Sequence, residues 1–98
     1  MSFEKTIGFD WDNGNWPHCA KHGVSRSEIE EVFINTPSIL AHPTHSINEQ
    51  RLKAIGKTDK GRMIYISFTI RTKLYGDYIR AISARYMHKK EIENYERQ

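Results

Sequence analysis

A stretch of alternating residues at positions 63–70 places the strongest constraint on how this chain folds. The two sets of side chains in it are Met63, Tyr65, Ser67 and Thr69 on one side, and Ile64, Ile66, Phe68 and Ile70 on the other. A period of two residues is typical of a β-strand with one face against a core. A further strand is expected at 78–86, after a loop at 74–77. Two strands joined by so short a connection are expected to pair antiparallel.

Shorter β-rich segments precede this pair. Strands are expected at 38–42 and at 50–56, with a polar turn at 57–61 that Gly61 closes. The N-terminal segment 9–11 is expected to be a short strand or an aromatic anchor. Together these segments predict an antiparallel sheet of about four strands joined as a meander.

Helices are expected on either side of the sheet. Asn15 is a candidate N-cap for a short helix that ends at Gly23. Ser25 and Glu28 match a capping box, which predicts the start of a second helix. The apolar stripe expected to face the core consists of Ile29, Val32 and Phe33. A C-terminal helix is expected at 89–97, so the predicted fold class is α+β.

The chain of 98 residues is expected to form a single domain over residues 1–98, because a second core would have too little surface to bury. No apolar run approaches the roughly 18 residues that span a membrane. The N-terminus does not have the order of a secretion signal. Cys19 is the only cysteine, which excludes an internal disulfide and favours a cytoplasmic protein with Cys19 in its core.

Charge is unevenly distributed along the chain. Residues 1–50 contain three basic and seven acidic side chains, whereas residues 51–98 contain twelve basic and five acidic ones. An asymmetry of this kind is typical of proteins that bind a polyanion such as nucleic acid. A merely solvated basic surface would give the same count, so charge alone leaves both interpretations open.

Several side chains are of the types that cleave RNA without a metal ion. Such a site must accept a proton from the 2′-hydroxyl, donate one to the leaving oxygen and stabilise the charge on phosphorus. The candidates for these tasks are Lys21, His22, Arg51, Ser83 and Arg85, with Arg80, Tyr65 and Glu91 as further candidates. Strict alternation places Ser83 and Arg85 on one face of their strand and Arg80 on the other. Spacing alone also permits structural ion pairs for the arginines and a capping role for His22.

A metal site is a weaker possibility. His18 and His22 are four residues apart and would share a helix face, where they could chelate a metal. The glutamate of a zinc-protease motif is absent between them. His42 and His45 could add ligands, although loop histidines are commonly only exposed.

Motifs along almost the whole chain resemble the BrnT toxins. They are Phe9-Asp10-Trp11-Asp12, Lys21-His22-Gly23-Val24-Ser25, Glu49-x-Arg51 leading to Gly56, Gly61-Arg62, Ile79-Arg80-x-Ile82-Ser83-Ala84-Arg85, and an ending at 86–96. The resemblance implies a RelE-like α+β domain that degrades RNA without a cofactor. It also implies neutralisation by a BrnA-like antitoxin with a ribbon-helix-helix domain, and contact with operator DNA only through that antitoxin.

The resemblance also carries functional residues. It implies functional roles for Lys21, His22, Arg51, Ser83 and Arg85, with Arg80 next to them. The first five are expected to be catalytic, and Arg80, Arg62 and Tyr65 are expected to bind RNA. The segment between Asp12 and Lys21 departs from the commoner family spacing, which leaves open where Lys21 and His22 point.

The resulting hypothesis is an endoribonuclease toxin that cleaves RNA without a metal ion. Arg51 and Arg85 would bind the scissile phosphate, Lys21 would add positive charge, Ser83 would donate a hydrogen bond and His22 would transfer protons. Two rivals stay open. One is a non-catalytic binding module that acts as a corepressor with its antitoxin, and the other is a metal-dependent hydrolase that uses His18 and His22.

Overall fold

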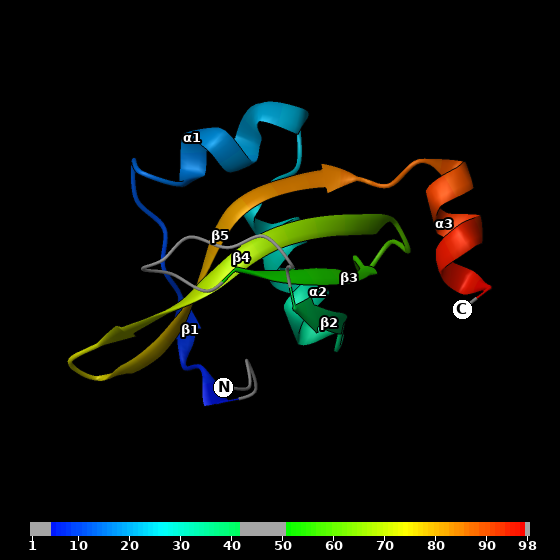
Figure 1. The fold of residues 1–98 in the computed structure, drawn as a ribbon. Coiled ribbons are helices and arrows are strands. Elements are labelled where there is room, and N and C mark those ends of the chain that lie inside the picture. Colours follow the sequence, from blue (N-terminus) through cyan, green and yellow to red (C-terminus); the bar gives the residue numbers. More distant parts are fainter. Residues whose placement is uncertain (1–4, 42–50, 98) are drawn as a thin grey trace.

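A computed structural model describes residues 5–41 and 51–97. Its strands are β1 (Gly8–Phe9), β2 (Ser38–Ala41), β3 (Leu52–Lys57), β4 (Met63–Lys73) and β5 (Gly76–Tyr86). They form one mixed sheet in the order β1-β5-β4-β3-β2 (Figure 1). Strands β2 to β5 pair antiparallel in succession, which confirms the expected meander. The fifth strand, β1, lies at the start of the segment 9–11 for which a short strand was one expectation, but its parallel pairing with β5 was not predicted.

The helices are α1 (Trp16–Cys19), the 3₁₀ turn η2 (Ala20–His22), α2 (Arg26–Ile34) and α3 (Lys89–Glu96). Figure 1 shows α2 behind the sheet, α1 beside β5 and α3 beyond the end of β5. None of the helices in the described part of the chain is long and apolar enough to cross a membrane. The fold is therefore α+β with a C-terminal helix, and the N-terminal helices match the expectation only roughly, because the first of them is divided into α1 and η2.

Local signals determine where the N-terminal helices begin and end. The Ser25 hydroxyl accepts a hydrogen bond from the Glu28 amide at 3.1 Å, and the Glu28 carboxylate accepts one from the Ser25 amide at 3.0 Å. This reciprocal pair is the expected capping box of α2. Gly23 ends η2 in the left-handed region with φ of 83°, which glycine adopts without steric cost.

Asn15 occupies the N-cap position of α1, but its side chain does not cap the helix. Its amide instead donates hydrogen bonds to the Asp10 carbonyl and the Ala81 carbonyl, both at 2.9 Å. The expected N-cap position is confirmed, but the side chain makes no capping bond because its Oδ1 already accepts a hydrogen bond of 2.9 Å from the Asp12 amide. Asn15 thereby ties α1 to the edge of β5.

The hydrophobic core lies between α2 and one face of the sheet. Ile29, Val32 and Phe33 of α2 are buried, as the apolar stripe predicted. The Phe33 ring packs edge-on against Phe68 of β4, with ring centroids 4.9 Å apart. Cys19 is fully buried in the same cluster, and burial raises the pKa of its thiol to about 11. Its expected role as a core residue is confirmed.

Candidate active site

One face of the sheet gathers polar and charged side chains. Paired residues of neighbouring strands lie on the same face, and the pairs concerned are Lys53 with Ser67, Ser67 with Ser83, Tyr65 with Arg85, Thr69 with Arg80, and Arg71 with Tyr78. We call the surface formed by these residues the polar face. The hydrophobic core lies against the other face of the sheet.

A β-bulge in β5 shapes the polar face. Ser67 pairs with Ser83 whereas the next residue of β4, Phe68, pairs with Ala81, so Ile82 is one extra residue in β5. The extra residue reverses the alternation at this point. Arg80 consequently lies on the same face as Ser83 and Arg85, which corrects the expectation that it would lie on the opposite face.

Arg85 is held by a carboxylate and an aromatic ring. Its two terminal nitrogens donate hydrogen bonds of 2.7 and 2.9 Å to the carboxylate oxygens of Glu91 on α3. Its guanidinium carbon lies 4.7 Å from the centroid of the Tyr65 ring, and the Lys53 ammonium lies 5.4 Å from that centroid. Lys53, Tyr65 and Arg85 therefore form one cluster, in which Lys53 is a residue that the sequence interpretation did not name.

The ion pair with Arg85 changes the pKa of the Glu91 carboxyl. The hydrogen bonds from Arg85, followed by one from the His88 amide, lower the pKa of Glu91 to about 2. Glu91 presents two oxygens to the guanidinium fork, the same arrangement that a phosphate group offers. A phosphate at Arg85 would thus compete with Glu91 for the same donors.

Arg80 is fixed by two aspartates. It donates hydrogen bonds of 3.0 and 3.1 Å to Asp12 and of 3.1 Å to Asp10, which also accepts one of 2.8 Å from Lys73. Burial alone would raise the pKa of Asp10, but the hydrogen bonds from Lys73 and Arg80 outweigh it and hold the pKa below its usual value. The Arg80 side chain is only 12% exposed. The ion pairs with Asp10 and Asp12 therefore hold the Arg80 side chain in a fixed position.

A pocket of about 430 Å³ opens beside Arg80. Its lining residues are Gly14, Asn15, His18, Arg51, Arg71, Arg80 and Ile82. The pocket brings together Arg51 and Arg80, both named from the sequence. It adds His18, which the sequence interpretation had weighed only as a metal ligand, and Arg71. Arg71 could have been found, because it continues the period-two alternation from Tyr65 along β4.

Arg51 and Arg85 are not brought together. Arg51 precedes Leu52, which pairs with Phe68, so Arg51 lies level with Thr69 of β4. Arg85 lies level with Tyr65, which is four residues away along the same strand, or roughly 13 Å. The structure therefore separates a Tyr65–Arg85 cluster from the pocket that contains Arg51.

Three other predicted residues come from elements outside this cluster. Lys21 and His22 are exposed on η2, which packs against β5. The guanidinium of Arg62 lies 3.5 Å from the centroid of the Tyr86 ring, and the Tyr86 hydroxyl donates a hydrogen bond of 2.7 Å to Glu28 of α2. Arg62 is thus on the side of the sheet that α2 covers, not on the polar face.

Metal ligands do not cluster within residues 5–41 and 51–97, where no group of three or more His, Cys, Asp or Glu side chains is placed to hold an ion. His18 lies on α1, whereas His22 lies on η2 after the helix has tightened. His42 and His45, the other candidate ligands, lie outside the described residues.

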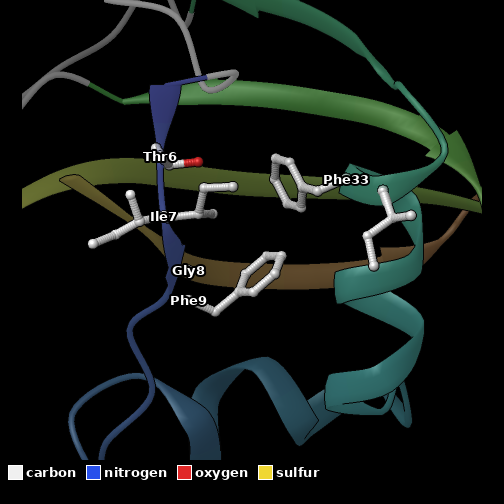
Figure 2. Close-up of a pocket in the computed structure, with 7 residues that line it drawn as sticks. Thr6, Ile7, Gly8, Phe9 and Phe33 are labelled. Atoms are coloured by element: carbon white, nitrogen blue, oxygen red, sulfur yellow. The ribbon is translucent and has the colours of Figure 1, made fainter. Parts of the chain in front are cut away.

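A second hollow lies between β1 and α2 (Figure 2). Its volume is about 300 Å³, and Figure 2 shows Phe9 and Phe33 pointing into it from the two elements. Among the described residues that line it, none carries a charge. This hollow therefore has no group for acid–base or phosphate chemistry.

The polar face gathers arginine, lysine and tyrosine side chains on an α+β fold, the side-chain types that are typical of surfaces that bind a polyanion. The particular family follows from comparison with known proteins. The family model described as ribonuclease toxin, BrnT, of type II toxin-antitoxin system matches residues 11–91, and the chain belongs to this family. A search of curated proteins gave no match.

Family membership confirms what the sequence motifs implied about class. The chain is a member of the ribonuclease toxins of type II toxin–antitoxin systems. Toxins of this class act on RNA and have an antitoxin as partner.

Proposed function

We propose that this chain is an endoribonuclease toxin that cleaves RNA without a metal ion, on the polar face around Arg85. The observation that carries the proposal is the bulge at Ile82, which puts Arg80, Ser83 and Arg85 on one face with Tyr65. The chain also belongs to a ribonuclease family, which supports the reaction class.

The proposed reaction uses the RNA as its own nucleophile. The 2′-oxygen attacks the adjacent phosphorus, the bond from phosphorus to the 5′-oxygen breaks, and a 2′,3′-cyclic phosphate and a 5′-hydroxyl result. One proton leaves the 2′-hydroxyl and one is delivered to the 5′-oxygen, so no metal or co-reactant is required.

Arg85 has the central role in this proposal. Its planar fork, now bonded to Glu91, binds the scissile phosphate and stabilises the additional negative charge of the transition state. Lys53, whose ammonium group also contacts the Tyr65 ring, adds positive charge. Ser83 donates a hydrogen bond to a phosphate or ribose oxygen. Arg51 lies with Arg80 instead, so the scissile phosphate is assigned to Arg85.

Proton transfer is assigned to His22, with Lys21 supplying further charge. Both residues lie on η2, and η2 packs against β5, the strand that carries Ser83 and Arg85. Imidazole exchanges protons near neutral pH, which suits both steps of the reaction. Substitution of His22 by alanine should therefore slow cleavage more than it weakens RNA binding.

The proposed partner is a BrnA-like antitoxin with a ribbon-helix-helix domain, acting with the toxin in the cytoplasm. Family membership in a type II system supports a protein antitoxin as the neutralising partner. In this proposal the antitoxin makes the main contacts with operator DNA, and the toxin acts as corepressor within the complex.

The test is the identity of the RNA ends that the purified chain produces in excess chelator, with and without ribosomes. The proposal expects 2′,3′-cyclic phosphate and 5′-hydroxyl ends, and no cleavage at a nucleotide whose 2′-hydroxyl is replaced by hydrogen. Ends with a 3′-hydroxyl and a 5′-phosphate would refute the mechanism. RNA that is bound but left intact under both conditions would refute catalysis and favour the binding module.

A further inference from the structure

Helix α3 contacts the sheet at the two ends of a single row of residues. The row consists of Ser38, Ile55, Tyr65 and Arg85, which pair in turn across β2, β3, β4 and β5 and therefore lie on one face. At one end of the row, Glu91 of α3 bonds to Arg85. At the other end, the Tyr95 hydroxyl hydrogen-bonds the Ser38 hydroxyl. The helix therefore lies at the end of the sheet where the polar face carries Tyr65 and Arg85 (Figure 1).

Glu91 takes the place at Arg85 that a phosphate group would occupy. Both terminal nitrogens of the Arg85 guanidinium donate to the Glu91 carboxylate, at 2.7 and 2.9 Å. A carboxylate and a phosphate each offer two oxygens to such a fork, and both are negatively charged. Two anions repel each other at this distance. A phosphate that uses the same fork must therefore displace Glu91.

The attachment of α3 to the sheet is weak enough for such a displacement. None of the residues of α3 is buried, and only Glu91, Ile92 and Tyr95 are even partly covered. The side chains of Arg85 and Glu91 are 37% and 33% exposed. Ion pairs with this degree of exposure contribute little to stability. Helix α3 can therefore leave the sheet at small cost.

The connection between β5 and α3 allows the helix to move as a unit. The Met87 amide donates a hydrogen bond of 3.0 Å to the Met63 carbonyl, so the chain is tied to the sheet as far as Met87. The next residue, His88, is exposed and is the N-cap of α3. Its amide donates a hydrogen bond of 3.0 Å to Glu91, which would move with the helix. A few residues at the end of an element are sufficient for a hinge.

We infer that α3 is an autoinhibitory element of this protein. In the free protein Glu91 fills the phosphate position at Arg85, and RNA binds there only after α3 has moved away from the row. This inference rests on the proposed function, because it takes Arg85 as the group that binds the scissile phosphate. Glu91 itself takes no part in the bond changes.

The first test measures binding of a fluorescent single-stranded oligonucleotide made of 2′-O-methyl nucleotides, which the proposed reaction cannot cleave. The test variant is Glu91→Gln, whose side chain keeps an oxygen for the His88 amide and so preserves the capping box. The control is Glu93→Gln, which removes the same charge from an exposed residue of the same helix. Circular dichroism checks that each protein is folded, and anisotropy gives the affinity.

Glu91→Gln is expected to bind the oligonucleotide at least about threefold more tightly than the parent, because an exposed ion pair that competes for Arg85 is weakened. Glu93→Gln should change the affinity by less than about 1.5-fold at about 0.15 M salt, because salt screens a charge that does not contact the phosphate. Equal changes in the two variants, or weaker binding by Glu91→Gln, would overturn the autoinhibitory role.

A second measurement follows the position of α3 in the parent protein. Hydrogen exchange of the amides at 92–97 is compared with and without a saturating amount of the oligonucleotide. Exchange is expected to become faster in the complex, because a helix of eight residues is marginal once it has left the sheet. Unchanged or slower exchange would mean that RNA binds with α3 in place, which would refute the displacement even if Glu91→Gln binds more tightly.

Arg85→Ala separates this inference from the proposed function. It is expected to bind the oligonucleotide about tenfold more weakly, because hydrogen bonds to a charged group are lost. In the Arg85→Ala background, Glu91→Gln should have no larger effect than Glu93→Gln. If Arg85→Ala binds as well as the parent, the assignment of the phosphate to Arg85 is wrong and the autoinhibitory role is refuted with it. If Arg85→Ala binds more weakly but Glu91→Gln binds no more tightly, only the role of α3 is refuted.

Discussion

At the scale of single residues, Arg80 and Arg85 differ in their burial and in their ion-pair partners. Arg80 is nearly buried and carries ion pairs to two aspartates, whereas Arg85 is partly exposed and paired with one glutamate. A buried charge is stable only while it is paired, so Asp10 and Arg80 depend on each other. Exposed pairs contribute little to stability, and Arg85 can exchange its partner at small cost.

This difference predicts unequal effects of two similar substitutions. Asp10→Asn should lower the free energy of unfolding by about 1–3 kcal/mol, because it leaves a partly buried guanidinium without its full partner. Asp12→Asn should lower it by less than about 1 kcal/mol, because the Asp12 side chain is 56% exposed. Urea unfolding of the two variants beside the parent measures both values. Equal losses would show that burial does not distinguish the two aspartates.

At the scale of elements, α3 is attached to the sheet through polar contacts. Glu91 binds Arg85 of β5, and the Tyr95 hydroxyl hydrogen-bonds the Ser38 hydroxyl of β2. None of the residues of α3 is buried. Its position therefore depends on the charge state of Glu91 more than on apolar packing.

Acid should weaken this attachment. The hydrogen bonds from Arg85 lower the pKa of Glu91 from its ordinary value of 4.5 to about 2. The stabilisation is therefore fully present above about pH 4.5 and is lost as the pH falls through 2. An NMR titration of the Glu91 carboxyl should give a midpoint near 2 in the parent and a higher midpoint in Arg85→Ala, where the hydrogen bond from the His88 amide still holds it below the ordinary value. A parent midpoint near 4.5 would contradict the bidentate pair.

The sequence predicted those elements whose signals are local. The capping box of Ser25 and Glu28 and the alternation in β4 depend on neighbouring residues, and both were confirmed. The bulge at Ile82 has no such signal, because an apolar residue fits the pattern of β5 whether or not it pairs. The position of Arg80 could not be predicted for that reason. The amide of Asn15 likewise bonds to Ala81, which is 66 residues away.

The candidate site was predicted in part for the same reason. Tyr65, Ser83 and Arg85 were named from the sequence and lie together on the polar face. Lys53 and Arg71 follow the same alternation but were not named. Which arginine lies beside Arg51 depends on the register between β3, β4 and β5, and no local pattern determines it.

At the scale of the whole molecule, the two halves of the chain differ in charge and in the elements that they form. The basic second half supplies most of the sheet and its polar face, and the acidic first half supplies α2 and the aspartates that hold Arg80. The polar face can therefore attract RNA while the rest of the molecule is close to neutral.

The proposed partner gives a prediction at this scale. A cognate ribbon-helix-helix antitoxin should stop RNA cleavage when it is added in equimolar amount, and the complex should bind its operator DNA. The toxin alone should show no preference for the operator over unrelated DNA, because in this proposal its cations contact phosphates, which carry no sequence information. Gel-shift assays with both DNA fragments measure this. Specific binding by the toxin alone would contradict the assignment of DNA contact to the antitoxin.

The central claim is that Arg85 on the polar face promotes cleavage of RNA without a metal ion. The most direct test compares RNA cleavage in excess chelator by the parent, by Arg85→Ala and by a control with Lys57→Gln and Lys60→Gln, two exposed side chains in and after β3, with folding checked by circular dichroism. The account predicts cleavage by the parent and the control, and a loss of at least about 100-fold in Arg85→Ala, because a charge-stabilising donor of the transition state is removed. A folded Arg85→Ala protein that cleaves as fast as the parent would contradict it.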